Sequence, residues 1–146
     1  MTTFGHTTMT RAANRMLTRM VGKGRGPRFI RLLTVPGRRT GLARTTPVVP
    51  LVTERGRWLV APYGEVGWVR NVRAAGEVTL SRGAAREVLR ATELDPADAV
   101  PVLRAYRSMK PAGWIVRSRL AFGPRASEAE IAAVADRYPV FRLSPR

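Results

Sequence analysis

The residues with the most evident chemical potential stand between Leu33 and Pro47 (LTVPGRRTGLARTTP). An apolar run ends there in a turn bounded by Gly37 and Gly41, and a polar run follows. Glycines let the backbone bend close to a ligand, so amides, guanidinium forks and hydroxyls can surround one anion. The anion ligands that this pattern predicts are Arg38, Arg39, Thr40, Arg44 and Thr46. An ordinary polar hairpin turn with exposed arginines explains the same pattern equally well.

A second candidate element lies in Ala61–Val72 (APYGEVGWVRNV). Pro62 and Gly64 end an apolar run. Trp68 and Asn71 then follow three residues apart, which places them on one face of a helix. An aromatic ring and a carboxamide that point the same way could stack on a planar ring and hydrogen-bond to it. The alternative is that Trp68 is a core residue and Asn71 a helix cap or surface residue.

The charge of the chain favours an anionic partner. Its 146 residues contain 26 Lys and Arg against 10 Asp and Glu, a formal net charge of +16. Arginine matches phosphate and carboxylate oxygens two at a time, which favours phosphate-bearing ligands, although an arginine-rich composition can also reflect a GC-rich genome. Because there is no cysteine and the only histidine is His6, thiol catalysis and histidine triads are excluded and no metal is expected.

No apolar stretch approaches the ~18 residues of a membrane-spanning helix, and we expect a cytoplasmic protein. The segment Thr10–Lys23 has basic residues every fourth position and apolar residues between them, which predicts an amphipathic helix. Its basic residues are Arg11, Arg15, Arg19 and Lys23. This helix could lie on an anionic membrane surface, or it could pack against the domain with its arginines in water.

These candidate residues require a scaffold, and the remaining pattern is typical of antiparallel strands. Short apolar and β-branched runs alternate with Gly, Pro or charged turns. We expect strands at Arg28–Val35, Arg44–Thr53, Arg57–Ala61, Glu77–Ser81, Arg86–Leu94 and Val140–Leu143. The prediction is a mainly β (α+β) protein: a six-stranded antiparallel barrel with an N-terminal amphipathic helix and peripheral helices. Residues 1–27 would form a tail and the helix, and residues 28–146 the barrel.

Three further helices are expected. Gly67–Ala75 has helical spacing of its apolar residues, and a helix to about Met109 opens at Asp95-Pro96, with the aspartate as its cap. Ser127 begins the last helix through a capping box with Glu130. In the segment Lys110–Arg125, the apolar residues follow neither helical nor strand periodicity. Its aromatic residues and arginines indicate a lid or pocket wall.

Taken together and in this order, the two candidate elements resemble the deazaflavin (F420)-dependent nitroreductase family, a branch of the split β-barrel flavin-binding proteins. The shared features are a strand that ends in Thr, the pattern G-R-(K/R)-(S/T)-G-x-x-R-x-x-P, and a later small-residue loop with W-x-x-N-(L/V). The resemblance covers Phe29 to Leu94, and the terminal YPVFRL is similar to the closing strand of the family. It implies that the barrel is a split β-barrel.

The resemblance also implies roles for individual residues. Arg39, Thr40 and Arg44 would hold the phosphate of the lactyl-glutamate tail of coenzyme F420. Pro47 and Val48 would line the deazaflavin. The rest of the cofactor cleft would consist of Ala61, Pro62, Tyr63, Gly64, Trp68 and Asn71. That tail carries a phosphate and several carboxylates, in agreement with the positive charge of the chain.

The implied activity is transfer of a hydride from reduced F420 to an electron-poor acceptor: an activated C=C bond, a quinone or a nitroaromatic. Because the cofactor carries the chemistry, the protein has mainly to bind and orient. Tyr63 and Tyr106 are the candidates to position a proton. The expected acceptor pocket is lined by Tyr106, Trp114 and Phe122. The acceptor stays open, because the C-terminal tyrosine cluster of nitro-drug-reducing members is missing.

Three alternatives remain at this stage. The same fold could bind FMN instead of F420, or the barrel could store or carry a cofactor or lipid without turnover. A basic module that binds nucleic acid would explain the charge. However, the arginines are distributed and no nucleic-acid-binding motif is present, so a nucleic-acid partner is not expected. A homodimer is possible, because split barrels often bury a sheet face by dimerising.

Overall fold

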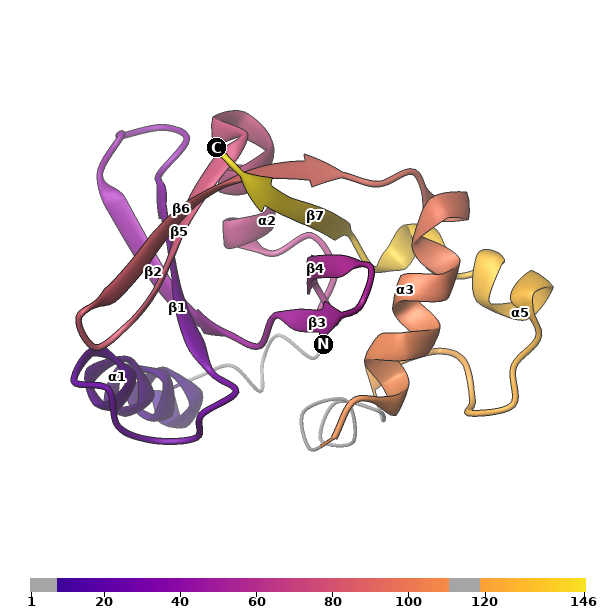
Figure 1. Cartoon of the computed structure of the whole chain (residues 1–146), viewed down its shortest axis with the longest axis horizontal. Coiled ribbons are helices and arrows are strands. Elements are labelled where there is room, and N and C mark those ends of the chain that lie inside the picture. Colours follow the sequence, from indigo (N-terminus) through magenta and orange to yellow (C-terminus); the bar gives the residue numbers. More distant parts are fainter. Residues whose placement is uncertain (1–7, 111–118) are drawn as a thin grey trace.

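The computed structural model of the chain describes residues 8–110 and 119–146. Its strands form one antiparallel, curled sheet in the order β2-β1-β5-β6-β7-β4-β3 (Figure 1). The strands are β1 (Arg31–Pro36), β2 (Ala43–Val48), β3 (Leu51–Thr53), β4 (Gly56–Val60), β5 (Glu77–Arg82), β6 (Ala85–Glu93) and β7 (Val140–Pro145). The mainly β, α+β architecture is confirmed.

The sheet has seven strands and not six, because the predicted strand Arg44–Thr53 is two strands that separate at Val49-Pro50. β2 pairs with β1, whereas β3 pairs with β4. Proline has no N–H for the ladder, so Pro50 cannot continue the pairing with β1. Only two residues therefore join the two ends of the sheet, and this short link requires the sheet to curl into a half-barrel.

The predicted helices are present as α1 (Thr8–Gly22), α2 (Gly67–Ala75), α3 (Pro96–Ser108) and α5 (Glu128–Ala132), and a 3-10 helix η3 (Ala135–Arg137) was not predicted. The capping box of α5 is confirmed: Glu130 N–H donates to Ser127 Oγ at 3.1 Å, and Ser127 N–H donates to Glu130 Oε1 at 3.0 Å. Asp95 occupies the cap position of α3, but the prediction that its side chain caps the helix is wrong, because it makes no such hydrogen bond.

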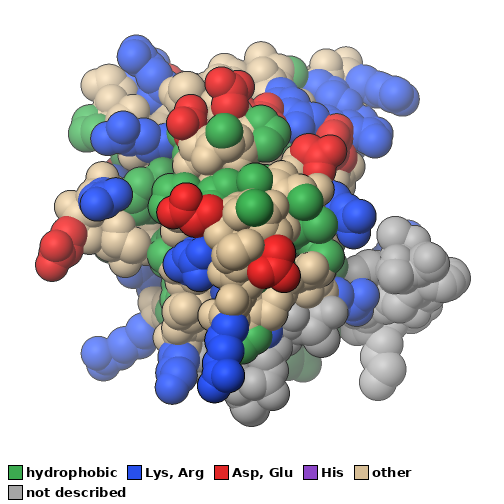
Figure 2. Space-filling view, turned by 90° about the vertical axis from the view of Figure 1, so that its right-hand side faces the viewer, with side chains coloured by type: hydrophobic (Ala, Val, Ile, Leu, Met, Phe, Trp, Pro, Cys, Tyr) green, Lys and Arg blue, Asp and Glu red, His purple; other side chains and the backbone are tan. Residues whose placement is uncertain are grey.

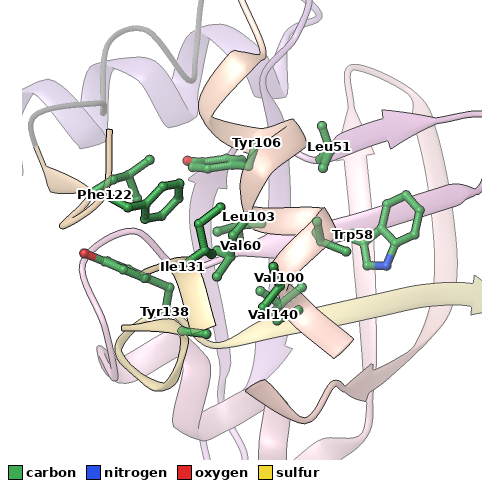
Figure 3. Close-up of a cluster of buried hydrophobic side chains, with 14 of the residues drawn as sticks. Leu51, Trp58, Val60, Val100, Leu103, Tyr106, Phe122, Ile131, Tyr138 and Val140 are labelled. Carbon is green, nitrogen blue, oxygen red and sulfur yellow. The ribbon is translucent and has the colours of Figure 1, made fainter. Parts of the chain in front are cut away.

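Two hydrophobic clusters meet at β4, whose faces are both buried. Leu59 points into the curl of the sheet, where Leu33, Val35 and Phe141 pack against Val69 and Val72 of α2. The alternate residues Trp58 and Val60 join the second cluster, which α3 and α5 cover (Figure 3). The alternation of a strand therefore lets β4 connect the barrel to the helical side.

α1 packs on the sheet where β1 begins and β2 ends. Its Val21 is fully buried against Ile30 and Leu32. The end of the helix lies so close to the β5–β6 turn that a Cβ on Gly83 would stand 3.2 Å from the Cα of Gly24. The cationic stripe faces outward, since its basic residues are exposed together with Met16. Within residues 8–110 and 119–146, no helix combines the length and apolarity needed to cross a membrane.

Charge is unevenly distributed over the surface. On the face formed by α3 and α5, acidic and hydrophobic side chains lie near the centre and basic side chains mainly around them (Figure 2). On the inner face of the sheet, Arg57 of β4 forms a two-pronged ion pair with Glu87 of β6, at 2.7 and 2.9 Å. This pair spans β7, which lies between the two strands, and so stabilises the curl.

Glu87→Gln removes the charge of this pair and should lower the free energy of unfolding by about 0.2–1 kcal/mol at neutral pH, because both side chains are partly exposed. Hydrogen bonding to Arg57 holds the pKa of Glu87 below its usual value of 4.5. The stabilisation is thus complete above that value and is lost as the pH falls through the lowered pKa. The free energy of unfolding in urea is measured for the unchanged protein and for Glu87→Gln, at neutral pH and well below pH 4.5. If the two proteins differ in stability by the same amount at both pH values, this role of the ion pair is contradicted.

Candidate functional site

The turn between β1 and β2 is closed by its own backbone. Gly37 N–H donates to the carbonyl of Leu42 and Gly41 N–H to the carbonyl of Gly37, both at 2.8 Å. Gly41 has φ +74°, a conformation that other residues rarely adopt. The exposed side chains of Arg38, Arg39 and Thr40 lie between the two glycines. The sequence-predicted turn is thus a rigid loop that presents two cations and a hydroxyl.

Two polar side chains converge on the face of Gly37 that lacks a side chain. A Cβ built there would stand 3.2 Å from Thr40 Oγ1 and 3.5 Å from Arg44 Nε. Thr40 Oγ1 also accepts a hydrogen bond of 3.2 Å from the N–H of Leu42, which fixes the position of the hydroxyl. The turn therefore brings the Thr40 hydroxyl and the Arg44 guanidinium together beside Gly37, where even a Cβ would be in tight contact.

The register of β2 separates the other predicted ligands into two groups. Arg44, Thr46 and Val48 stand opposite inward-facing residues of β1. Thr45 and Pro47 point to the opposite face, where the hydroxyls of Thr45 and Thr34 are hydrogen-bonded at 3.0 Å. Pro47 and Val48, expected side by side along one ligand, consequently face opposite sides of the sheet, because successive residues of a strand alternate.

Asn71 is the only polar residue in the buried class among the residues described, at 7% exposure. Its Oδ1 accepts hydrogen bonds from the backbone N–H and from Nη1 of Arg38, both at 3.0 Å. The helical spacing predicts that the side chains of Trp68 and Asn71 point the same way. In the structure Asn71 instead holds the β1–β2 turn, and Trp68 packs at a tilt against Phe141 with ring centroids 6.2 Å apart.

The loop Ala61–Val66 leads from β4 to α2 and is fixed at both ends. Ala61 N–H donates to the carbonyl of Pro139 at 2.9 Å. At the other end, Glu65 binds Arg73 at 2.7 Å, and Arg73 also forms a two-pronged pair with Glu93 of β6 at 2.7 and 2.8 Å. Hydrogen bonding to Glu93 and Glu65 raises the pKa of Arg73. This cluster was not predicted, because Glu65 and Glu93 lie 8 and 20 residues from Arg73 along the chain and no local pattern links them.

The two candidate tyrosines have different surroundings. Tyr63 is 49% exposed, and the guanidinium carbon of Arg119 lies 5.3 Å from the centroid of its ring. Tyr106 is 4% exposed, and burial, with a smaller effect of Tyr63, raises its pKa. A raised pKa makes Tyr106 a weaker acid than an ordinary tyrosine. The side chain of Tyr63 is therefore the more exposed of the two.

The predicted acceptor residues fall partly within the described chain. Tyr106 and Phe122 belong to the same buried cluster (Figure 3), and Phe122 packs edge-on against Tyr138 with centroids 6.3 Å apart. Arg107 Nε donates to the carbonyl of Phe122 at 3.0 Å and so ties this segment to α3. Trp114 lies outside the described residues, as does half of the predicted lid segment Lys110–Arg125.

The residues present fit the anionic tail of F420. Within the described part of the chain, Arg39 and Arg44 form no ion pair, so their guanidinium groups are available to an external anion. Thr40 adds a hydroxyl, which lies beside Arg44 Nε at Gly37. Arginine forks and a hydroxyl are donors that phosphate prefers.

Comparison with solved structures identifies the fold. A chain described as a domain-swapped dimer aligns with a TM-score of 0.56 and 19% identity, over 94% of this chain and 100% of its own. An F420-H2 dependent reductase, FDR-A, aligns with a TM-score of 0.53 and 22% identity, over 80% and 95%. HutZ, the heme storage protein from Vibrio cholerae, aligns with a TM-score of 0.55 and 11% identity, over 90% and 89%. At these identities the matches establish the split-barrel fold alone.

The sequence itself identifies the family. No curated protein matches the chain significantly. In contrast, the model of the F420H(2)-dependent quinone reductase family matches residues 6–119, which is most of the chain. The chain is therefore a member of the F420H(2)-dependent quinone reductase family, an F420-dependent oxidoreductase whose cofactor is coenzyme F420.

Proposed function

We propose that this reductase passes a hydride from F420H2 to a quinone, and that the β1–β2 turn holds the cofactor's phosphate. The observation that supports this phosphate site is that Thr40 Oγ1 and Arg44 Nε converge beside Gly37. The name of the family supports a quinone acceptor over an activated C=C bond or a nitroaromatic. Arg39 extends the same positive surface, since it follows Arg38 in the exposed turn.

Arg38 and Asn71 have a positioning role in this proposal. Asn71 Oδ1 accepts hydrogen bonds from both the backbone and the side chain of Arg38, and so holds the turn to α2. Thr46 and Val48 lie on the same face of β2 as Arg44 and continue from the phosphate site toward the ring. Pro47 faces the other side and supports the edge strand from there.

The loop Ala61–Gly64 would border the ring, with Pro62 and Tyr63 as its central residues. The Glu65–Arg73–Glu93 cluster keeps this loop at a fixed distance from α2 and β6. Trp68, half-buried against Phe141, would form an apolar wall of the cleft. A loop held in this way reduces the ordering that cofactor binding would otherwise require.

Reduced F420, when bound, supplies the hydride. The chain's own contribution is to bind the tail, to orient the ring and to hold a proton near the acceptor. Tyr63 is the proposed proton donor, because its side chain is exposed and Arg119 lies over its ring. Tyr106, Phe122 and Trp114 are proposed to line the acceptor pocket, with Tyr106 as a buried wall.

α1 provides a route to an apolar acceptor. It exposes Met16 (64%) and Met20 (37%) beside outward-facing arginines, a combination that suits an anionic membrane surface. We propose that the protein is cytoplasmic and takes its quinone at such a surface. A homodimer is also proposed, in line with the structural relative described as a domain-swapped dimer.

Arg44→Ala should weaken F420 binding by about 1.5–3 kcal/mol, because it removes a charged partner of the phosphate. The dissociation constant is measured from the change in F420 fluorescence. Arg55→Ala is the matched control: Arg55 is also an exposed turn arginine, but in the β3–β4 turn at the far end of the sheet. Equal affinity of Arg44→Ala and the control would refute the phosphate site.

Asn71→Ala should lower the free energy of unfolding by about 1–3 kcal/mol, because a partly buried N–H of Arg38 loses its acceptor. It should also weaken F420 binding, since the turn is no longer held to α2. Arg70→Ala, an exposed change on the same helix, is the control for both measurements. If Asn71→Ala is as stable as Arg70→Ala, the turn does not depend on Asn71.

Tyr63→Phe should lower kcat with F420H2 and a soluble quinone by roughly a hundredfold or more, since a positioned proton donor contributes about 10²–10⁴-fold. Tyr106→Phe should leave kcat nearly unchanged, because a buried hydroxyl with a raised pKa is poorly suited to donate a proton. Steady-state kinetics with F420 affinity measured in parallel separates catalysis from binding. The reverse order of the two effects would assign the proton to Tyr106.

A further inference from the structure

The curled sheet is closed at one end only. α2 packs into the end where β1 finishes, whereas a hollow of about 670 Å³ opens at the other end, where β1 begins and β2 finishes. Its walls include an apolar set of residues: Phe29, Val49, Pro50, Val52, Leu80 and Met109. The volume is within the usual range of small-molecule sites, roughly 300–1,000 Å³.

Basic residues strongly outnumber acidic residues around this hollow. Five are basic, and within the described chain Glu87 is the only acidic one. The basic residues are Arg31, Arg57, Arg82, Arg86 and Lys110. Glu87 is already committed to Arg57 through their two-pronged ion pair. The other four cations therefore have no carboxylate partner among the residues described.

Two of these cations are held close together by the backbone. Arg31 Nη1 donates to the carbonyl of Ile30 at 3.0 Å, and Arg82 Nη1 donates to the same oxygen at 3.1 Å. Arg82 also binds the carbonyls of Gly26 and Pro27, and Arg31 binds that of Arg28. These contacts fix both guanidinium groups in place despite their mutual repulsion, so little ordering would remain for an anion to impose.

The hollow is distinct from the proposed phosphate site. Arg31 begins β1, while the turn with Arg39 follows the end of the same strand. At a rise of about 3.3 Å per residue, the two ends of β1 lie roughly 16 Å apart. α2 and the buried cluster fill the space between them.

We propose that the hollow is a second binding site, for an organic anion with one carboxylate or phosphate and an apolar body. The anionic group binds at Arg31 and Arg82, with Lys110 as a further cation of the rim. The apolar body lies against Leu80 and Val52. The site requires no F420 and does not depend on the role proposed for the β1–β2 turn.

Isothermal titration of the whole protein with octyl phosphate and with octanoate tests the proposal, and the two arms distinguish the preferred head group. We expect saturable binding of one equivalent of either anion. Octanol, which lacks the charge, should bind with an affinity at least about tenfold lower. Inorganic phosphate, which lacks the apolar body, should also be weaker. No binding of either anion, or equal binding of octanol, would overturn the proposal.

Variants locate the site. Arg31→Gln and Lys110→Gln should each weaken binding of the preferred anion by at least about tenfold. Arg90→Gln is the control, since it removes one exposed charge from the outer face of β6. Lys110→Gln keeps the test valid if Arg31→Gln is unstable, because Lys110 makes no side-chain hydrogen bond or ion pair in the described chain. Losses no larger than in Arg90→Gln would overturn the assignment.

Saturation with F420 separates this site from the cofactor site. Unchanged affinity for the anion in F420-loaded protein is expected. Competition between the two ligands would show that the hollow belongs to the cofactor site and would overturn the proposal of a second site. Conversely, anion binding that persists while Arg44→Ala leaves F420 binding unaffected would refute the phosphate site alone.

Discussion

The hydrogen bonds between Asn71 and Arg38 determine the geometry of the proposed cofactor site. A single buried carboxamide oxygen accepts both the backbone and the side-chain N–H of Arg38, and so joins α2 to the β1–β2 turn. Without them, the turn would keep its own backbone hydrogen bonds but would not be held to α2. With them, Thr40 and Arg44 converge at a fixed place over Gly37. A preorganised anion site of this kind binds without a large loss of conformational entropy.

The second constraint is the short link at Val49-Pro50. It joins strands at opposite ends of the sheet and thereby imposes the curl. The inner face of a curled sheet encloses a space that has two ends. α2 fills one end and positions the turn beside it, and the other end stays open as a basic hollow. Basic residues thus lie at both ends of the barrel, at the β1–β2 turn and around the hollow, which charge composition alone could not show.

The sequence predicted local features well. The turn Gly37–Gly41, the bounds of α2 and the capping box of Ser127 depend on neighbouring residues, and all three are present. Features that depend on distant partners were not predictable. The run Arg44–Thr53 is apolar enough to be one strand, and only the change of partner at Pro50 divides it. Helical spacing placed Asn71 on a face but could not show that Arg38 lies opposite it. Arg73 gave no signal because Glu93 is distant in sequence.

The position of the phosphate in a structure of the complex with F420 tests the central claim most directly. The account predicts phosphate oxygens within hydrogen-bonding distance, about 2.7–3.2 Å, of Thr40 Oγ1 and the Arg44 guanidinium, with Asn71 still bound to Arg38. A phosphate that instead lies in the hollow beside Arg31 and Arg82, with the β1–β2 turn free of ligand, would contradict it.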